Sequence, residues 1–365
     1  MDTGEPGSAL IGRVKVTQPT DTVLIRVSAD GPSPAEASTL ANAWITALSR
    51  QVADIEGGSR ATVRLVPQES AALPSSPVSP NPRRDLPLAV VLGLLLGLGL
   101  AVLRAQLDRR VRTPDDVRAL GLTVLTAIPA TKALGRNEGR IPVVTDARGA
   151  AKDPAASEAI RRLRTNLRYM NVDDPPRIIV VTSPNEGDGK STIASNVAAA
   201  MAASGQPTIL VDADLRRPVI ARGMGAVEGG GLTDVLTGEV LVEDVLQQSG
   251  ELVVLGAGNI PPNPSELLGS RAMKRLVDDL ARERIVIIDA PPLLPVTDAA
   301  VLSTVADGVI LVVSAGRTLD THVERAVHEV VEVNGRVLGV VLNKTARRDS
   351  AGYYGGAGKY YQRSQ

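Results

Sequence analysis

The stretch RIIVVTSPNEGDGKSTIASNVAAAMAASG, Arg177–Gly205, decides the fold class of this chain. It opens with a continuous apolar run that ends at Thr182, passes through a turn-rich loop, and enters an alanine-rich segment at Lys190. An apolar strand, a loop ending in Gly-Lys-Ser-Thr and a helix-forming sequence together form the context of a P-loop. Successive backbone N–H groups and a helix N-terminus bind phosphate oxygens in such a loop. We therefore predict a nucleotide site here.

Each residue type in the loop suits phosphate chemistry. The ammonium of Lys190 would reach the β- and γ-phosphates, and the hydroxyl of Ser191 would ligate magnesium. The pattern GxxxxGK[ST] asks for glycine at position 184, where this chain has Pro184. The predicted phosphate-binding residues are Glu186, Gly187, Asp188, Gly189, Lys190, Ser191 and Thr192.

Two further apolar runs end in acids. VDADLRRP places Asp212 and Asp214 after one run, and VIIDAPP places Asp289 after another. Ligands bind at the carboxyl edge of an open parallel sheet, so these acids should lie beside the P-loop. Three carboxylates there would hold magnesium and orient or deprotonate a hydroxyl nucleophile. The alternative is that some of them cap the following helices. For Asp289, which two prolines follow, we favour the metal role.

A parallel sheet is the predicted frame of this site. Apolar runs buried on both faces, with helical segments between them, are typical of a parallel sheet with helices on both sides. We therefore predict an α/β fold. The predicted strands are RIIVVTS, TILVDAD, LVVLGAG, RIVIIDAP, GVILVVSAG and VLGVVLN.

The segment LPLAVVLGLLLGLGLAVL, Leu86–Leu103, predicts a membrane span. It has no charged residue, and as a helix it would be about 27 Å long, close to the thickness of a bilayer core. A buried core helix is the alternative, but a uniformly apolar circumference with cationic ends is unusual in one. Arginine is denser after the span, which predicts that the following part is cytoplasmic and lies near anionic lipid.

Composition shifts along the chain predict its organisation. Strands within Arg13–Ala29 and a helix over Pro34–Val52 should form a small α+β piece, and Thr113 should cap a helix that starts at Pro114. The predicted parts are an α+β fragment (1–72), a proline-rich spacer (73–85), a transmembrane helix (86–104), a juxtamembrane segment and linker (105–150), a nucleotide-binding domain (151–346) and a tail (347–365).

Overall composition excludes several function classes. Lysine plus arginine equals aspartate plus glutamate at 40 each, which gives no reason to expect nucleic-acid binding. Cysteine is absent from the sequence, so disulfides, thiolate metal sites and a cysteine nucleophile are excluded. His322 and His328 lie six apart on a predicted helix, a spacing that favours a solvated helix over a metal pair.

On these residues the chain resembles the bacterial tyrosine autokinases (BY-kinases) of capsule and exopolysaccharide export. SPNEGDGKST is similar to their Walker A motif, VDADLRRP to Walker A′ and VIIDAPP to Walker B. GAGNIPPNPSELL, Gly256–Leu268, is close to a segment specific to that family. The resemblance runs from about Ala105 to Thr345, and residues 10–104 resemble the end of a Wzz-type chain-length determinant. It implies a MinD/ParA-like P-loop NTPase fold.

The resemblance also implies roles for single residues. Lys190 and Ser191 would bind Mg–ATP, either Asp212 or Asp214 would be the base for an attacking tyrosine, and Asp289 would lie near magnesium. The predicted catalytic residues are Lys190, Asp212 and Asp214, and the predicted magnesium ligands are Ser191, Asp212 and Asp289. Asn343, in GVVLNK, sits where related P-loop ATPases contact adenine.

A helix-forming stretch, SEAIRRLRTNLRYM, is similar to the ExxRxxR pattern of that family through Glu158, Arg161 and Arg164. The resemblance implies that these residues join copies of the chain in a ring. Taken alone, the residues favour a solvated helix with an internal Glu–Arg pair, which contributes little stability.

The tail AGYYGGAGKYYQRSQ carries four of the five tyrosines of the chain, among glycines that oppose packed structure. The resemblance implies that a neighbouring subunit phosphorylates them. Each phosphate would add about −1.5 to −2 charges, which would weaken docking of the tail. A disordered tail without this role is the alternative. The predicted phosphoacceptors are Tyr353, Tyr354, Tyr360 and Tyr361.

The expectation is a membrane-anchored tyrosine autokinase that uses ATP and Mg²⁺, with its kinase domain on the cytoplasmic side of a bacterial membrane. Its expected partners are further copies of itself, membrane lipid, the polysaccharide polymerase or export machinery, and a phosphotyrosine phosphatase. The alternatives are a MinD/ParA-type switch ATPase and a catalytically idle co-polymerase scaffold. Switch ATPases usually have an early second lysine in the loop, where this chain has Asn185. Because the family has an earlier span and a long extracytoplasmic region, we expect a shortened gene or a mis-set start codon.

Overall fold

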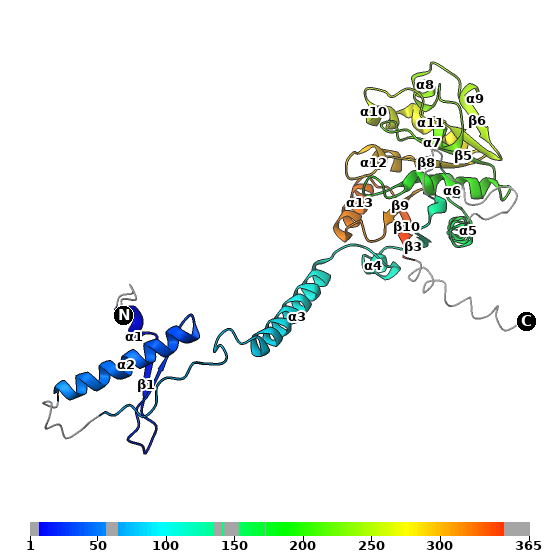
Figure 1. Cartoon of the computed structure of the whole chain (residues 1–365). Helices are drawn as coiled ribbons and strands as arrows, with labels where there is room; N and C mark the ends of the chain where they lie inside the picture. Colours follow the sequence, from blue (N-terminus) through cyan, green and yellow to red (C-terminus); the bar gives the residue numbers. More distant parts are fainter. Residues whose placement is uncertain (1–6, 56–64, 135–140, 142–152, 172, 347–365) are drawn as a thin grey trace, which may run out of the picture. The chain divides into compact units, whose positions relative to one another are not determined.

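The computed structural model describes residues 7–55, 65–134, 141, 153–171 and 173–346. The chain divides into two units, Met1–Ala105 and Gln106–Gln365, and each is described by itself (Figure 1). The four tyrosines predicted as phosphoacceptors lie outside the described residues.

The first unit combines a strand pair with a long helix. Val14 pairs with Ala29 in an antiparallel ladder, and the helix buries only Ala37 and Ala41. The predicted strand pair and helix are therefore confirmed, with a small core. Trp44, the one tryptophan of the chain, lies on this helix. The elements are α1 (Gly7–Ile11), β1 (Val14–Thr17), β2 (Arg26–Ala29) and α2 (Pro34–Ile55).

Helix α3 (Pro82–Leu107) contains the predicted span. Within its segment Pro82–Arg104, the most apolar 18-residue window has a mean hydropathy of 2.6, and none of that window is buried. Among the described residues, it is the one helix long and apolar enough to cross a membrane. The helix begins at Pro82, four residues before the predicted start. Its first turn is favoured because Asp85 accepts a hydrogen bond from the N–H of Asn81 (3.0 Å).

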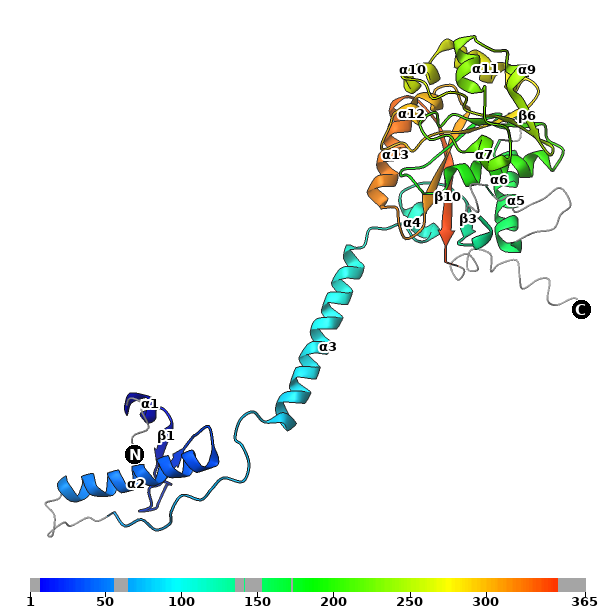
Figure 2. The same cartoon turned by 45° about the horizontal axis from the view of Figure 1, so that its top comes forward.

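An eight-stranded sheet forms the second unit, in the order β3-β10-β9-β4-β8-β5-β7-β6. Figure 2 shows β3 and β10 side by side, with β6 away from them. Every neighbouring pair is parallel except β6–β7, a hairpin at one edge. The mostly parallel P-loop NTPase fold is therefore confirmed. The strands are β3 (Val124–Pro129), β4 (Ile178–Thr182), β5 (Thr208–Asp212), β6 (Leu246–Ser249), β7 (Leu252–Leu255), β8 (Ile285–Asp289), β9 (Gly308–Ser314) and β10 (Val337–Thr345).

Helices cover both faces of this sheet. Figure 1 shows α12 and α13 on one side and α5 and α6 on the other. The helical elements are α4 (Pro114–Ala119), η2 (Lys132–Leu134), α5 (Pro154–Arg168), α6 (Lys190–Ala202), α7 (Ile220–Met224), α8 (Leu232–Thr237), α9 (Val242–Val245), α10 (Pro264–Leu268), α11 (Arg271–Ala281), α12 (Asp298–Ser303) and α13 (Asp320–Glu332).

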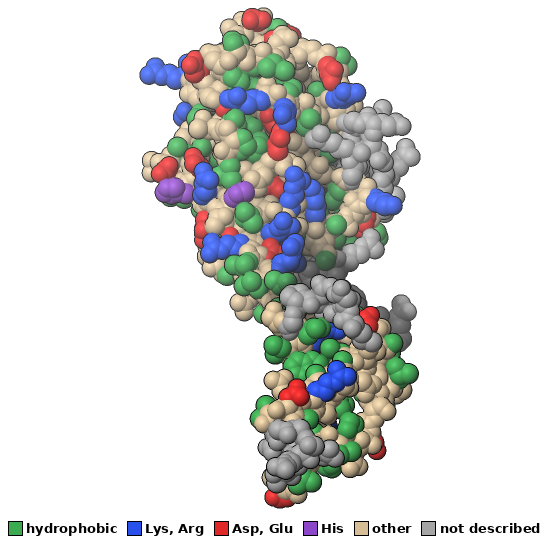
Figure 3. Space-filling view, turned by 60° about the vertical axis from the view of Figure 1, so that its left-hand side comes forward, with side chains coloured by type: hydrophobic (Ala, Val, Ile, Leu, Met, Phe, Trp, Pro, Cys, Tyr) green, Lys and Arg blue, Asp and Glu red, His purple; other side chains and the backbone are tan. Residues whose placement is uncertain are grey.

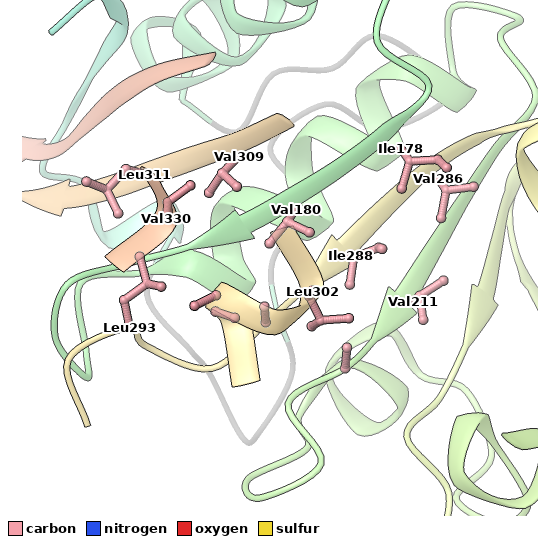
Figure 4. Packing of buried hydrophobic residues seen from close by; sticks show 14 of the residues in the cluster. Ile178, Val180, Val211, Val286, Ile288, Leu293, Leu302, Val309, Leu311 and Val330 are labelled. Atoms are coloured by element: carbon pink, nitrogen blue, oxygen red, sulfur yellow. The ribbon is translucent and has the colours of Figure 1, made fainter. Parts of the chain in front are cut away.

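Two apolar clusters fill the spaces between sheet and helices. Side chains alternate between the faces of a strand, so neighbours on β4 enter different clusters. Val180 joins the cluster under α12 and α13, which includes Leu302 and Val330 (Figure 4). Ile179 joins the cluster on the other face, which includes Leu163 of α5. Burial on both faces explains why the strands are continuous apolar runs.

Strand β3 corrects one part of the predicted organisation. We assigned residues 105–150 to a juxtamembrane segment and linker, but Val124–Pro129 is a fully buried strand beside β10. Helix α5 covers it: the amide of Asn166 donates to the C=O of Leu125 (2.6 Å). The cap predicted for α4 is confirmed, because Thr113 and Asp116 bond reciprocally in a capping box.

The place of β3 in the core predicts a large effect for Ile128→Ala. Ile128 is fully buried, so the substitution should lower the free energy of unfolding by about 2–5 kcal/mol. Val331→Ala, at a half-exposed site on α13, should change it by less than about 0.5 kcal/mol. Urea unfolding of residues 106–365, followed by circular dichroism, measures both. Equal effects would mean that residues 124–129 are a linker.

Candidate functional site

The loop between β4 and α6 has the backbone shape of a phosphate cradle. Gly187 and Gly189 take left-handed conformations, with φ of +79° and +107°. Position 189 needs glycine for two reasons. Its backbone is left-handed, and a Cβ there would lie 2.3 Å from the amide nitrogen of Asn343. Pro184 has no positive φ, so the position where the standard motif has glycine does not need one here.

The end of β10 holds this loop in place. The amide of Asn343 donates to the C=O of Asp188 (2.9 Å), and the ammonium of Lys344 donates to the C=O of Gly187 (2.7 Å). The other end of the Asn343 amide accepts the N–H of Lys344 (2.9 Å). Both ends of this side chain are therefore engaged with backbone, whereas the resemblance implied a contact with adenine.

Asp188 acts as an internal brace of the loop. Its carboxylate accepts the N–H of Asn185 (3.1 Å) and the hydroxyl of Thr318 (3.0 Å). Burial raises the pKa of Asp188. Because this carboxylate is buried and bonded, phosphate contacts at this position would come from the backbone.

Lys190 lies between two acids at the N-terminus of α6. Its Nζ is 2.7 Å from Oδ2 of Asp214 and 3.6 Å from Oδ1 of Asp289. It also donates to the hydroxyl of Ser191 (3.3 Å). Burial disfavours the charged form of Lys190, but the two carboxylates outweigh it and raise its pKa. The structure therefore brings together these four residues, which the sequence analysis assigned to one site.

Asp212 and Asp289 lie side by side, as register partners at the ends of the neighbouring parallel strands β5 and β8. Oδ2 of Asp212 accepts the N–H groups of Val219 (3.0 Å) and Ile220 (2.9 Å), so Asp212 caps α7, as the alternative allowed. Burial and the charge of Asp289 raise the pKa of Asp212 to about 7.

Asp289 differs from Asp212 in its bonding. Neither of its buried carboxylate oxygens makes a hydrogen bond within the described part of the chain. Burial raises its pKa. Carboxylate oxygens that make no hydrogen bond, beside the Ser191 hydroxyl, fit magnesium, which prefers oxygen ligands. In the described ranges, no group of three Asp, Glu or His side chains is arranged so that it could hold a metal ion by itself. Most ligands of the ion would therefore be phosphate and water oxygens, as is usual for magnesium.

A cavity of about 900 Å³ opens above these residues, and its volume suits a nucleotide. Thr192, which the sequence analysis included, is part of its wall. The segment after β3 also contributes, although no phosphate-binding motif marks it in the sequence. The lining residues are Pro129, Ala130, Thr131, Lys132, Leu134, Glu186, Gly187, Gly189, Lys190, Ser191, Thr192, Asp214, Arg217, Val219, Arg317, Asn343 and Lys344.

The segment Gly256–Leu268 contacts a buried ion pair that could not be predicted from the sequence. Asp298 is fully buried and pairs with Arg216 of the Walker A′ loop (2.8 Å). The hydroxyl of Ser265, within this segment, donates to the same carboxylate. Burial opposes ionisation, but Arg216 and Ser265 hold the pKa of Asp298 below its usual value. The segment therefore helps to fix the loop that carries Asp214.

Helix α5 has the internal Glu–Arg ion pair that we predicted for a solvated helix. Glu158 pairs with Arg161 (3.1 Å) and with Arg162 (3.2 Å), and all three side chains are partly exposed. Arg164 instead donates to the C=O of Ala200 in α6 (3.4 Å). The helix thus presents Glu158 and Arg161 together on its surface.

The two histidines lie apart from the site, on α13. They are the purple side chains on the surface in Figure 3. His328 is exposed and lies 2.9 Å from Glu332, one turn further along. The prediction of a solvated helix is therefore confirmed.

The raised pKa of Asp212 predicts a pH dependence of stability. Its folded-state pKa, about 7, lies above the unfolded value of about 3.9. Between these values the folded state holds a proton that the unfolded state has released. Stability should therefore fall as pH rises through this window and level off above it. Asp212→Asn keeps an oxygen for the N–H groups of α7 and should flatten that fall.

Urea unfolding of residues 106–365 in EDTA, at about pH 5 and pH 8, measures the effect. Asp173→Asn, at an exposed site, is the control and should keep the wild-type pH dependence. An unchanged pH dependence in Asp212→Asn would contradict the titration of Asp212 in this range.

A family model and two solved structures are similar to this chain. A family model described as ParA: NUBPL iron-transfer P-loop NTPase matches residues 174–349. The solved kinase domain of Escherichia coli tyrosine kinase ETK is similar with a TM-score of 0.60 and 29% identity, covering 65% of this chain and 96% of that one. The chimerical protein CapA2B2 is similar with a TM-score of 0.57 and 34% identity, covering 64% of this chain and all of that one.

Curated relatives give the family. The tyrosine-protein kinase etk of Escherichia coli K12 is 30% identical over 308 residues, which are 80% of this chain but only 42% of that relative. The chain thus spans about two fifths of the length of etk. The tyrosine-protein kinase YwqD of Bacillus subtilis is 39% identical over 212 residues, which are 57% of this chain and 90% of YwqD. Identity at this level over nearly the whole of YwqD shows that the chain belongs to the family of bacterial tyrosine-protein kinases.

Proposed function

We propose that this chain is a membrane-anchored, ATP-dependent tyrosine kinase that phosphorylates its own C-terminal tyrosines in trans. Through this reaction it regulates the polymerisation or export of a polysaccharide. One observation carries the proposal: Lys190 is held between Asp214 and Asp289 beside a nucleotide-sized cavity. The curated relatives to which the chain is similar include YwqD and etk, which are named tyrosine-protein kinases.

The surroundings of the acids assign their tasks. Asp214 lines the cavity and is bonded to Lys190, whereas Asp212 is committed to the backbone of α7. We therefore assign the base to Asp214, which accepts the proton of the attacking tyrosine hydroxyl. Lys190 moves from Asp214 to the β- and γ-phosphates and stabilises their charge.

Mg–ATP, when bound, supplies the phosphoryl group that the tyrosine oxygen receives, and ADP leaves. The Ser191 hydroxyl and the Asp289 carboxylate, whose oxygens make no hydrogen bond among the described residues, would hold the ion. The backbone N–H groups of the loop and the N-terminus of α6 would orient the phosphates. The phosphoryl group goes to the tyrosine and the proton to Asp214, so the step is balanced.

The position of the end of β10 supports the tail as substrate. Strand β10 ends at Thr345, directly after Asn343 and Lys344 in the cavity wall. The described part of the chain therefore ends at the edge of the sheet where the site lies, and the tail follows directly in the sequence. Four of the five tyrosines lie in its last thirteen residues.

The properties of α3 support the membrane anchor. Its apolar residues are exposed along the whole span, and the basic residues after it predict a cytoplasmic kinase unit. We further propose that Glu158, Arg161 and Arg164 contribute to self-association, and that membrane lipid, the polysaccharide machinery and a phosphatase are partners.

A switch ATPase is the second candidate, because the ParA family model matches residues 174–349. Such a protein would hydrolyse ATP without forming phosphotyrosine. An idle scaffold would do neither.

The kinase proposal predicts phosphotyrosine at four mapped positions. After incubation with Mg–ATP, mass spectrometry should find phosphate on Tyr353, Tyr354, Tyr360 and Tyr361. Lys190→Met should reduce it by at least about a hundredfold, because the lysine stabilises transferred charge. Nucleotide binding without any phosphotyrosine in the wild type would favour the switch ATPase.

A mixing experiment tests the trans step. The Lys190→Met chain keeps its tail but lacks activity, and a chain with all four tail tyrosines changed to Phe keeps its site but lacks acceptors. Incubated together with Mg–ATP, they should yield phosphotyrosine on the Lys190→Met chain alone. Wild type that phosphorylates itself while the mixture stays unlabelled would mean transfer within one chain.

Self-association through α5 predicts different effects for two neighbouring arginines. Arg161 and Arg162 both pair with Glu158, but only Arg161 belongs to the ExxRxxR pattern. Arg161→Glu should lower the mass of the particle measured by sedimentation in detergent, and Arg162→Glu is the matched control. Equal masses for both variants would argue against this interface.

A further inference from the structure

An ion pair outside the assigned catalytic set links two loops at the cavity. Arg217, in the loop after β5, pairs through its guanidinium with the carboxylate of Glu186 in the phosphate loop. Both side chains line the nucleotide cavity. Nothing in the proposed mechanism uses this pair.

The backbone places Arg217 at the lysine end of the cavity. Its N–H donates to Oδ1 of Asp214 (3.1 Å), while Oδ2 of the same carboxylate accepts from Lys190 (2.7 Å). A lysine in this position reaches the β- and γ-phosphates. Arg217 therefore enters the cavity at the end where the last phosphate of a triphosphate lies.

The two arginines of the Walker A′ loop differ in how firmly they are held. Arg216 makes two hydrogen bonds to Asp298, whose side chain is completely buried. The Arg217–Glu186 pair is open to solvent, with 73% and 57% of the side chains exposed. An exposed ion pair contributes little and is readily exchanged. Arg217 is therefore free to change its partner, and Arg216 is not.

We propose that Arg217 is a ligand of the terminal phosphate, and that Glu186 is an internal competitor for its guanidinium. Without a triphosphate, Arg217 pairs with Glu186. When a triphosphate enters, the guanidinium leaves Glu186 and binds the terminal phosphate, an anion that matches its planar donors. The carboxylate of Glu186 then opposes binding, although the backbone of the same residue remains part of the phosphate loop. This inference rests on the proposed nucleotide site.

The proposal predicts that replacing Arg217 and replacing Glu186 change the affinity for a triphosphate in opposite directions. Calorimetric titration of the full chain in detergent, with Mg²⁺, would compare a non-hydrolysable ATP analogue with ADP. Arg217→Gln should weaken the analogue by about tenfold or more and change ADP by less than about twofold. Glu186→Gln should tighten the analogue by about two- to fivefold. Arg222→Gln, which removes an exposed arginine on α7, is the control and should change neither.

The double variant Glu186→Gln/Arg217→Gln shows whether Glu186→Gln acts by releasing Arg217 or only by removing a negative charge from the cavity. If Glu186 acts by holding Arg217, then Glu186→Gln should have no effect in the Arg217→Gln background. The same tightening in both backgrounds would overturn the proposal, because it would show a general charge effect. Weakening by both single variants would overturn it too, since the pair would then be a brace between the loops.

The comparison of ADP with the ATP analogue tests whether Arg217 contacts the terminal phosphate. An equal loss of ADP and analogue affinity in Arg217→Gln would place its contact away from the terminal phosphate and overturn the assignment. Wild type that binds neither nucleotide would overturn the proposed function together with this inference. Wild type that binds both, with no response to Arg217 or Glu186, would overturn this inference alone.

Discussion

The crowding of three carboxylates around one lysine is the constraint on which the site depends. Asp212 and Asp289 face each other in the sheet, Asp214 lies two residues further along, and all three are buried. Burying like charges is unfavourable unless they are neutralised or bonded. The chain meets this in three ways: Lys190 pairs with two acids, the backbone of α7 bonds Asp212, and Asp212 keeps a proton up to about pH 7. Of the three acids, only Asp289 has carboxylate oxygens that make no hydrogen bond among the described residues, which makes it the natural place for a cation.

Local sequence predicted much of this arrangement. Six strands, the P-loop and the three acids were found because each strand is a continuous apolar run and each acid follows one. Strand β3 was missed, although VLTAIP is also an apolar run, because its partner is β10, which is the last of the eight strands of the sheet and lies far along the sequence. The pairing of Arg216 with Asp298 joins positions 82 residues apart, and that of Asn343 with Asp188 joins positions 155 apart. Such contacts depend on how segments meet in space, and a pattern along the chain does not contain them.

Two oddities of the sequence have structural reasons. Pro184 replaces a standard glycine at a position that needs no left-handed backbone, while Gly187 and Gly189 supply that conformation later in the loop. Gly258 lies within the family-specific segment, has a φ of +80°, and leaves no room for a Cβ beside Asp234. The amide of Asn259 donates to the same aspartate (2.9 Å). This segment is therefore constrained by packing and bonding as well as by its contact with the Walker A′ loop.

The uneven distribution of aromatic residues separates the two units optically. Trp44 on α2 is the only tryptophan, and Tyr169 is the only aromatic residue within the described part of the second unit. Fluorescence excited at the red edge of the tryptophan band therefore comes from the first unit alone, whatever happens at the nucleotide cavity. A single tryptophan introduced at the cavity wall of a Trp44→Leu chain would be seen against a dark background. The scarcity of aromatics makes each unit separately observable in the intact molecule.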